Sequence, residues 1–405
     1  MRIRAFQGLI PRADLAADLA SPPYDVLNTA EARAIIAAQP RSFLRAVRAE
    51  ATLPEDADPY REAVYLQAKV NFEQMQTDGE LVREPSPQIY LYRQVMGAHS
   101  QMGLTAVCRA DDYAAGLIKK HEKTRPDKED DRVRLNTMLS AHIEPVFLAF
   151  ESTPAIDTLM RQAAQTHPLF DFTAPDGGRH TLWRMPDAAA VTRAFAAVPH
   201  TYIADGHHRS AGAARVGMAR REANRQHTGE EDYNWFPAVL FPQDQLQILP
   251  YNRLVSDLNG LSPEEFLVRV SHACRLQPSA PPAPDAPGRV SMYFGGHWLG
   301  LELDIPQGAD PVSRLDVSLL QDGILAPILG IDDPRTSKRI DFAGGIRGTD
   351  FLRGQVDAKR AAVAFSMHPV TMRQLMDIAD AGQIMPPKST WFEPKLRSGL
   401  FVHTF

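Results

Sequence analysis

The sequence predicts an α+β fold with more than one substructure, and three features of the chain support this. Its 405 residues exceed what one hydrophobic core usually supports, since domains run to roughly 100–200 residues. Segments that alternate large and small side chains, as strands do, are interspersed with alanine-rich segments typical of helices. The 32 prolines are spread along the chain and favour many short elements.

The N-terminal residues 1–105 are predicted to form an α+β segment. Helix-start residues favour a helix from Asn28 to about Gln39, and a second helix is expected from about Pro59 to Gln76. Residues 89–95 alternate large side chains as a strand does, and residues 103–108 are expected to pair with them in a hairpin.

The middle of the chain is predicted to form a core over residues 106–275. Buried strands are expected at 145–150 and 201–204, the second followed by an alanine-rich helix over about 210–224. Residues 277–287 hold five prolines and predict a linker to a C-terminal α+β lobe at 288–405, which begins with a hairpin over about 290–303.

Composition excludes several classes of protein. The chain has 44 Lys and Arg against 49 Asp and Glu, a formal charge of −5, whereas a nucleic-acid or anionic-membrane binder needs a basic excess. No apolar run approaches the ~18 residues needed to span a bilayer. The N-terminus lacks a signal-peptide pattern, so we expect a cytoplasmic protein. The two cysteines, Cys108 and Cys274, form no CxxC pair for a disulfide framework or zinc site.

The turn from Asp205 to Arg209, between a predicted strand and helix, has the residue types of a phosphate site. Gly206 allows close backbone approach, the helix start offers N–H groups, and Arg209 adds a bidentate donor. The alternative is that Asp205 caps the helix and His207 and His208 only decorate the turn. Adjacent histidines point in different directions, so they are not expected to form a metal pair.

The segment from Lys119 to Arg134 is the most charged of the chain, with twelve charged residues of sixteen. Such a run is usually a solvated surface, and that alternative stays open. Within it, Glu122 stands among Lys119, Lys120 and Arg125, which favour its charged form and suit a polyanion. A base beside a phosphate clamp is what phosphoryl transfer to a hydroxyl requires.

Two later segments also carry cations. Lys388, followed by two hydroxyl residues, suggests phosphate binding, yet the glycines of a phosphate-binding loop are absent. The alternative is a proline-rich segment that packs Trp391 and Phe392. Residues 333–345 offer cations and a glycine turn, or only a hairpin with charged edges. The chain has no GxGxxG, GxxxxGK(S/T), GxSxG or HExxH motif, which removes the commonest dinucleotide, nucleotide-loop, hydrolase and zinc-protease classes.

The Asp-Gly-His-His-Arg-Ser sequence at 205–210 resembles a bacterial and archaeal family filed as a domain of unknown function. Lys120-His121-Glu122, the opening at 21–26 and Pro-Pro-Lys-Ser-Thr at 386–390 fit the same family. Its central region is similar to the free serine kinases (SerK), which have the ParB/sulfiredoxin-like fold. The resemblance therefore implies such a core and phosphorylation of free L-serine to O-phosphoserine, a step in serine and cysteine metabolism.

The resemblance also implies roles for individual residues. Glu122 corresponds to the catalytic base, with Asp205 and His207 beside it as catalytic residues and Asp205 as the Mg²⁺ ligand. The residues expected to bind the phosphate donor are Lys119, Lys120, His121, Arg125, Gly206, His208, Arg209 and Lys388. The donor in relatives is ADP, ATP or pyrophosphate, and pyrophosphate is expected for this long chain. More than eighty residues separate Glu122 from Asp205, so the donor pocket is expected to be rebuilt.

Two other functions compete with the kinase. One is a ParB-like switch that binds or hydrolyses nucleotides, or a regulatory binding protein, either of which would use the same phosphate-binding turn. A ParB-type switch should also bind DNA, and the net negative charge of the chain disfavours DNA binding. A sulfiredoxin-like repair enzyme needs a cysteine near the turn, where position 207 is His. The sequence predicts only small-molecule partners, with no nucleic acid or membrane, and leaves the oligomeric state open.

Overall fold

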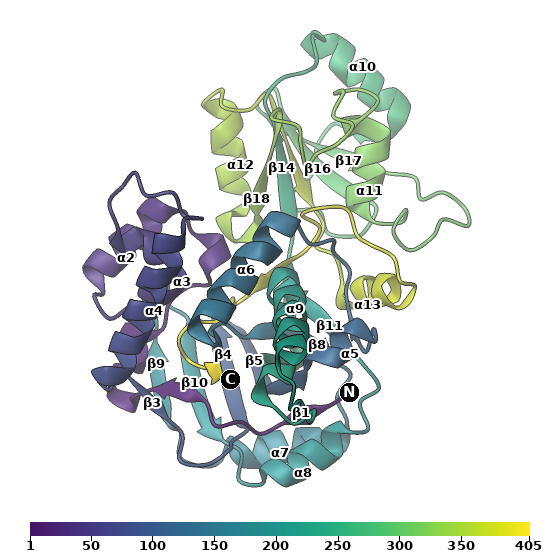
Figure 1. Cartoon of the computed structure of the whole chain (residues 1–405). Helices are drawn as coiled ribbons and strands as arrows, with labels where there is room; N and C mark the ends of the chain where they lie inside the picture. The colour runs from purple at the N-terminus through teal and green to yellow at the C-terminus, as the bar shows by residue number, and fades with distance from the viewer. The chain divides into compact units, whose positions relative to one another are not determined.

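The computed structural model describes all residues 1–405 and forms two compact units (Figure 1). The first unit comprises residues 1–246 and 394–405, and the second comprises residues 247–393. The chain thus leaves the first unit after Leu246 and returns to it at Pro394. This division differs from the predicted boundaries at 105/106 and 275/288, because it depends on a return of the chain that no local composition signals.

The proline-rich segment 277–287 is a connection inside the second unit and does not link two domains. It joins β15 (Arg275–Gln277) to β16 (Arg289–Phe294), and both strands pair with β17 (His297–Glu302) in one sheet. The pairing of β16 with β17 confirms the hairpin predicted over about 290–303.

A nine-stranded sheet forms the centre of the first unit. Its strands are β1 (Ile3–Arg4), β4 (Tyr90–Met96), β5 (His99–Arg109), β6 (Ile118–Lys119), β8 (Val146–Phe150), β9 (Phe170–Thr173), β10 (Arg179–Arg184), β11 (Thr201–Asp205) and β12 (Trp235–Pro242). The order is β6-β11-β8-β12-β5-β4-β10-β9, with β1 also on β5. Only β6 with β11 and β8 with β12 pair in parallel. The antiparallel pair β4 and β5 confirms the predicted hairpin.

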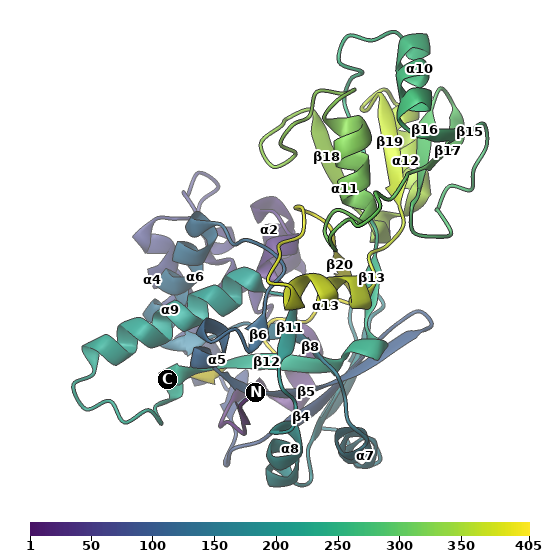
Figure 2. The ribbon, with the colours of Figure 1, turned by 90° about the vertical axis from the view of Figure 1, so that its right-hand side faces the viewer.

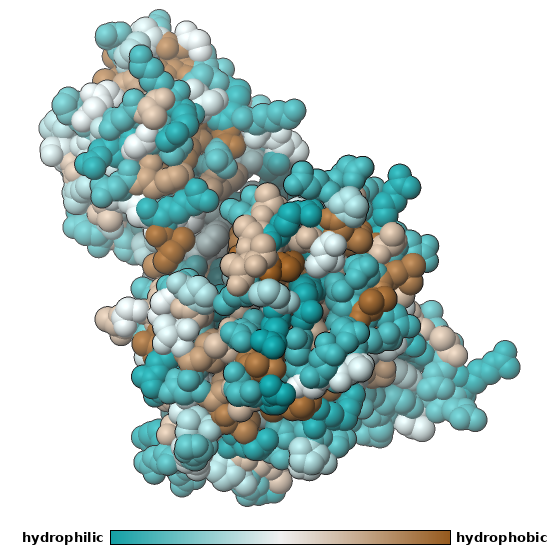
Figure 3. Space-filling model, turned by 90° about the vertical axis from the view of Figure 1, so that its left-hand side faces the viewer, coloured by the Kyte–Doolittle hydropathy of each residue, from teal (hydrophilic) through white to brown (hydrophobic).

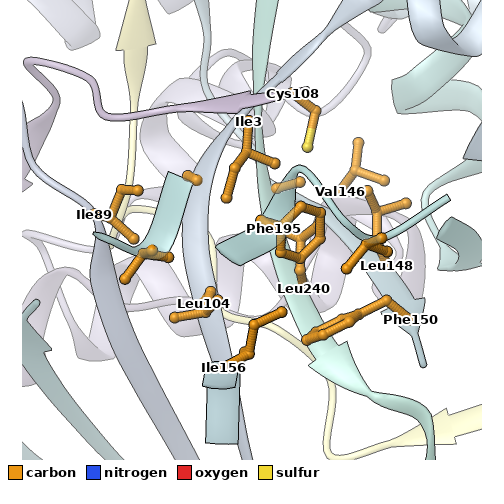
Figure 4. Close-up of a cluster of buried hydrophobic side chains, with 14 of the residues drawn as sticks. Ile3, Ile89, Leu104, Cys108, Val146, Leu148, Phe150, Ile156, Phe195 and Leu240 are labelled. Carbon is orange, nitrogen blue, oxygen red and sulfur yellow. The ribbon is translucent and has the colours of Figure 1, made fainter. Parts of the chain in front are cut away.

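Helices cover both faces of this sheet, as its edge-on view in Figure 2 shows. Helices α7 (Pro154–Ala163) and α8 (Ala188–Phe195) lie on one face, and α9 (His207–Ala223) lies on the other with α6 (Pro126–Leu139) packed against it. Between the sheet and α7 and α8, a hydrophobic core buries side chains such as Leu104, Phe150 and Phe195 completely (Figure 4). This core fixes the strand ends that carry the site.

The N-terminal helices build a second core in the first unit. The predicted helices are confirmed as α2 (Thr29–Ala38) and α4 (Glu62–Thr77). Asn28 and Glu31 form a reciprocal capping box that starts α2. The shorter elements of this unit are α1 (Ala16–Leu19), α3 (Leu44–Val47), α5 (Ala110–Ala114) and the strand pairs β2 (Leu9–Pro11) with β3 (Leu81–Arg83) and β7 (Ala141–His142) with β21 (His403–Thr404).

The second unit contains a six-stranded antiparallel sheet, which β14 (Tyr251–Val255), β18 (Ile340–Gly344) and β19 (Val363–Met367) form together with β15, β16 and β17. The strand order is β15-β17-β16-β19-β14-β18. The elements outside this sheet are β13 (Gln247–Leu249), β20 (Trp391–Glu393), α10 (Pro263–Ala273), α11 (Asp316–Leu320), α12 (Gly348–Asp357) and α13 (Met372–Asp380). The segment 333–345 is not a hairpin by itself, because β18 pairs with β14, which lies far earlier in the chain.

The architecture confirms the predicted α+β class, since mostly antiparallel sheets are packed against helices in both units. On the face drawn in Figure 3, hydrophobic residues are scattered among hydrophilic ones. Large exposed hydrophobic side chains such as Val70 and Ile346 need no special explanation when isolated. No helix has both the length and the apolar character required to cross a membrane.

Candidate phosphoryl-transfer site

The candidate site is built on the turn between β11 and α9 in the first unit. Strand β11 ends at Asp205, Gly206 adopts φ 96°, and α9 begins at His207. A glycine is required there for two reasons. A side chain would be strained at this φ, and a Cβ atom would lie 3.1 Å from Cζ of Arg209, whose side chain packs against the turn.

Opposite charges are concentrated at this turn. Oδ2 of Asp205 accepts a hydrogen bond from Nζ of Lys395 at 3.0 Å, and Oδ1 lies 3.5 Å from Nη2 of Arg209. Burial alone would raise the pKa of Asp205, but Lys395 and Arg209 outweigh that effect and hold the pKa well below its ordinary value. Asp205 is therefore a stable anion shared by two cations.

Arg209 is the most enclosed cation of the site. Its side chain is 6% exposed, Nη1 donates to the carbonyl oxygen of Pro145 at 2.6 Å, and Nη2 lies 3.8 Å from Oδ2 of Asp25. Burial tends to lower the pKa of Arg209, yet Asp205 and Asp25 raise it above the ordinary value, so the guanidinium stays charged.

The predicted base reaches the same turn through strand pairing. Strands β6 and β11 are parallel neighbours, so the residues that follow them emerge at one edge of the sheet. Oε2 of Glu122 lies 3.8 Å from Nδ1 of His207, and the rings of His121 and His207 meet edge-to-face with centroids 4.5 Å apart. The Glu122 side chain is 45% exposed and thus accessible to a small molecule.

Three buried polar atoms of the site have no hydrogen-bond partner. They are Nδ1 of His121, Nε2 of His207 and Nε of Arg209. Burial lowers the pKa of His121 to about 4, and burial together with His121 lowers the pKa of His207 well below its usual value. Both rings are therefore neutral at pH 7, and their unpartnered nitrogens suit a polar ligand, because orphaned buried groups are costly.

His207 and His208 face different partners, as predicted. His208 accepts a hydrogen bond at Nε2 from the backbone N–H of Arg125 at 3.0 Å, which ties the charged segment to α9. The guanidinium of Arg125 is exposed and pairs with Asp127 at 2.8 Å. Burial is the main cause that lowers the pKa of His208.

The other predicted lysines are more dispersed. Lys119 is partly buried in β6, whereas Lys120 is exposed and its ammonium lies 5.5 Å from the ring centre of Tyr113. Lys388 belongs to the second unit, where it is exposed with φ 57° and its ammonium lies 5.3 Å from the ring centre of Tyr251. In that unit Phe392 is buried, as the packing alternative for the segment expects.

The charged segment 119–134 is only partly a solvated surface. Arg132 of α6 is 6% exposed and pairs with Glu144 at 3.2 Å and with Asp131 at 2.7 Å. A small internal cavity lies beside this network, lined by Arg132, Glu144, Arg209, Asn136, His142, Val146, Ala213, Phe236 and Pro237. Arg209 thus lines the same cavity as the paired side chains of Arg132 and Glu144.

Lys395 and Glu144 are site residues that the motif analysis does not single out. Lys395 ends the segment 385–395, in which Lys388 was the expected phosphate-binding cation, and it stands 190 positions from Asp205. Glu144 precedes a buried strand and also accepts a hydrogen bond from Ser398 at 2.8 Å. The only signal in the sequence is that Glu144 lies directly beside a strongly hydrophobic run, because a buried glutamate nearly always has a charged or hydrogen-bonding partner.

The residues present do not fit a Mg²⁺ ion held by Asp205. Mg²⁺ demands octahedral geometry and usually takes one or two carboxylates together with water and phosphate oxygens. Here both oxygens of Asp205 face cationic side chains. The predicted metal role of Asp205 is therefore not retained.

The fold and site define an α+β protein with buried, paired charges at a strand-to-helix turn. The chain belongs to the family described as "Protein of unknown function (DUF1015)", whose model matches residues 3–318. The predicted resemblance to a domain of unknown function is thus confirmed at the level of the family. No curated protein matches the chain.

Solved structures give only distant similarities. A free serine kinase in complex with AMP has 12% identity and a TM-score of 0.37, covering 71% of this chain and 86% of the kinase. SbnI with a C-terminal truncation, from Staphylococcus aureus, has 11% identity and a TM-score of 0.38, covering 71% and 82%. A conserved hypothetical protein from Pyrococcus furiosus has 12% identity and a TM-score of 0.35, covering 73% and 93%.

Proposed function

We propose that the protein is a phosphotransferase that moves a phosphoryl group to the hydroxyl of free L-serine and forms O-phospho-L-serine. The observation that carries this proposal is the juxtaposition of the Glu122 carboxylate with the turn that carries Arg209, through His207 at 3.8 Å. A base and a phosphate clamp at one sheet edge are the parts that phosphoryl transfer to an alcohol needs. The choice of serine rests on the motif resemblance to free serine kinases.

The donor is proposed to bind over the start of α9. Its phosphate oxygens would accept hydrogen bonds from the first backbone N–H groups of the helix and from the Nε–H of Arg209, which has no protein partner. The unpartnered nitrogens of His121 and His207 add polar contacts on the side of Glu122. The other predicted donor-binding residues of the first unit, Lys119, Lys120, Arg125 and His208, stay part of the proposal as supporting cations and backbone contacts. A role for Lys388, which belongs to the second unit, stays a separate prediction.

Glu122 is proposed to act as the general base. As the serine oxygen forms its bond to the transferred phosphorus, the hydroxyl proton passes to Glu122. The bond from that phosphorus to the bridging oxygen of pyrophosphate breaks, and the bridging oxygen leaves with orthophosphate. Because this transition state is loose and rich in charge, the fixed cations contribute more than the base does early in the step. His207, in contact with Glu122, orients its carboxylate.

Pyrophosphate is the proposed donor, with ADP and ATP as alternatives. It has no adenine ring, so cations and N–H groups must supply nearly all of its binding. The enclosed turn offers these groups, and the fixed arrangement of Arg209 suits a small polyanion.

An end-point assay of the purified full chain tests the proposal. L-serine is incubated with pyrophosphate, ADP, ATP or polyphosphate in a buffer containing Mg²⁺, and O-phosphoserine is measured by mass spectrometry. L-alanine, which lacks the hydroxyl, replaces serine as the matched control. We expect O-phosphoserine with pyrophosphate and no phosphorylated product with alanine. Donor consumption that is equal with serine and alanine would contradict a kinase and favour a nucleotide- or pyrophosphate-hydrolysing switch. Saturating activity with ADP or ATP and none with pyrophosphate would overturn the proposal that pyrophosphate is the donor.

A further inference from the structure

The C-terminal segment, residues 394–405, is an integral part of the first unit. Leu400, Phe401 and Val402 are fully buried. The backbone of Val402 exchanges hydrogen bonds with that of Leu9 at 2.9 and 3.0 Å, and Ser398 exchanges hydrogen bonds with Ser21 at 3.1 and 2.9 Å. The segment is therefore held firmly enough to position a side chain.

Lys395 is the residue of this segment that reaches the site. Its carbonyl oxygen accepts a hydrogen bond from Nε2 of Gln94 at 2.8 Å, which anchors its backbone to the central sheet. Its ammonium donates to Oδ2 of Asp205 at 3.0 Å, and its side chain is only 19% exposed. Such a partly buried pair is screened less by water and salt than a surface pair.

The pair with Lys395 determines how strongly Asp205 attracts Arg209. Asp205 divides its charge between the two cations, and the distance from Oδ1 to Nη2 of Arg209 is 3.5 Å, longer than a short charge-assisted hydrogen bond. Without the lysine, the full carboxylate charge would act on Arg209 alone and compete with an incoming anion.

We propose that Lys395 is a positioning residue that acts through Asp205 to hold the Arg209 guanidinium ready for the phosphate groups of the donor. This inference rests on the proposed function for the identity of the donor and makes the C-terminal segment part of the site. It also explains why the carboxylate that the motif assigns to a metal is occupied by a lysine of the chain itself.

The test measures equilibrium binding of pyrophosphate to the full chain by calorimetry, together with kcat and the KM for serine. We expect Lys395→Met to weaken pyrophosphate binding about tenfold, within the range measured for coupled charged neighbours, with the KM for serine changed much less. Lys395→Arg should restore most of the affinity. Lys395→Gln, which keeps a donor without the charge, is the second variant and should behave like Lys395→Met.

Arg397→Gln is the matched control, because Arg397 lies on the same segment and bonds His180 at 3.2 Å and Asp176 instead of the turn. It should keep normal pyrophosphate affinity. In an Asp205→Asn background, Lys395→Met should have no further effect if the lysine acts through Asp205.

Unchanged pyrophosphate affinity in folded Lys395→Met and Lys395→Gln proteins would overturn the inference. An equal loss in Arg397→Gln, or a full additional loss in the Asp205→Asn background, would also overturn it, because each shows that the lysine does not act through Asp205. If the expected binding pattern is found but no O-phosphoserine forms, the proposed function fails while the inference about Lys395 stands.

Discussion

The two compact units bury different kinds of side chain. The first unit encloses many charged and titratable groups, among them Arg132, Glu144, Arg209, His121 and His207, whereas the buried charged residues of the second unit are Arg253 and Asp316. Buried charges are expensive unless they are paired or needed for function. The comparison favours the first unit as the location of the proposed site, although the sequence motifs pointed to both units.

Two lysines show the same contrast on a smaller scale. Lys388 stands in a motif with two hydroxyl residues and is exposed in the second unit. Lys395, further along the same segment, pairs with Asp205 in the first unit. We therefore expect the partly buried lysine that pairs with the turn to matter more for the proposed site than the exposed lysine of the motif.

The largest effect is expected from Glu122→Gln, which keeps the shape of the side chain but cannot take a proton. Turnover should fall about 10²–10⁴-fold, the usual contribution of a general base, while serine and donor affinities change much less. Steady-state kinetics and equilibrium binding together separate the two effects. A loss confined to affinity would make Glu122 a binding residue, and near-normal turnover would move the base elsewhere.

Acid should destabilise the first unit before the second. Burial lowers the pKa of His121 to about 4 from the ordinary 6.5. Between pH 6.5 and pH 4, His121 is therefore protonated in the unfolded chain and neutral in the folded chain. Stability is therefore complete above pH 6.5 and is lost as pH falls toward 4. Between pH 7 and pH 5, His121 alone should lower the free energy of unfolding by about 2 kcal/mol.

Other buried histidines of the first unit act in the same direction. Burial lowers the pKa of His142 and His180 to about 3 and that of His403 to about 4. Hydrogen exchange read by mass spectrometry at pH 7 and pH 5 reports each unit separately once intrinsic rates are corrected. Equal loss of protection in both units, or earlier loss in the second unit, would contradict the expectation that acid destabilises the first unit first.

Arg209→Lys tests the planar donor at the turn while keeping its charge. A lysine cannot reproduce the fork that bonds Pro145 and still leaves Nε for a ligand. Donor affinity should fall about 10–100-fold, as expected for lost charge-assisted hydrogen bonds, with the KM for serine nearly unchanged. Calorimetry with pyrophosphate measures the first quantity. An unchanged donor affinity in a folded variant would remove the phosphate assignment from Arg209.

Lys388→Ala should give the smallest effect. An exposed cation contributes roughly 0–1 kcal/mol, so we expect the KM for pyrophosphate to rise by about fivefold or less. A point variant is required, because truncation before Pro386 would also remove Leu400 and Phe401 from the core of the first unit. A rise above tenfold would place the second unit in the donor site and weaken the contrast between the units.

Local parts of the fold were predictable from the sequence, and long-range returns of the chain were not. The capping residues Asn28 and Glu31 signal α2 directly, and alternation identifies the hairpin of β4 and β5. Helix α9 begins at His207, earlier than the predicted start near 210, because Gly206 already makes the turn. The return of the chain at 394 rests on contacts with residues near the N-terminus, which leave no local pattern.

The candidate site divides in the same way. Glu122 and the 205–209 turn could be found because each carries its residue types within a few positions, and their strands are parallel neighbours. The pairs of Asp205 with Lys395 and of Arg132 with Glu144 could not, because charge pairing is set by the packed structure.

Phosphorus balance during turnover distinguishes phosphoryl transfer to serine from hydrolysis of pyrophosphate. The full chain is incubated with L-serine and pyrophosphate, and all phosphorus species are followed by ³¹P NMR. We expect one O-phosphoserine and one orthophosphate for each pyrophosphate consumed, and no consumption when serine is left out. Two orthophosphates for each pyrophosphate, with or without serine, would contradict phosphoryl transfer to serine at this site.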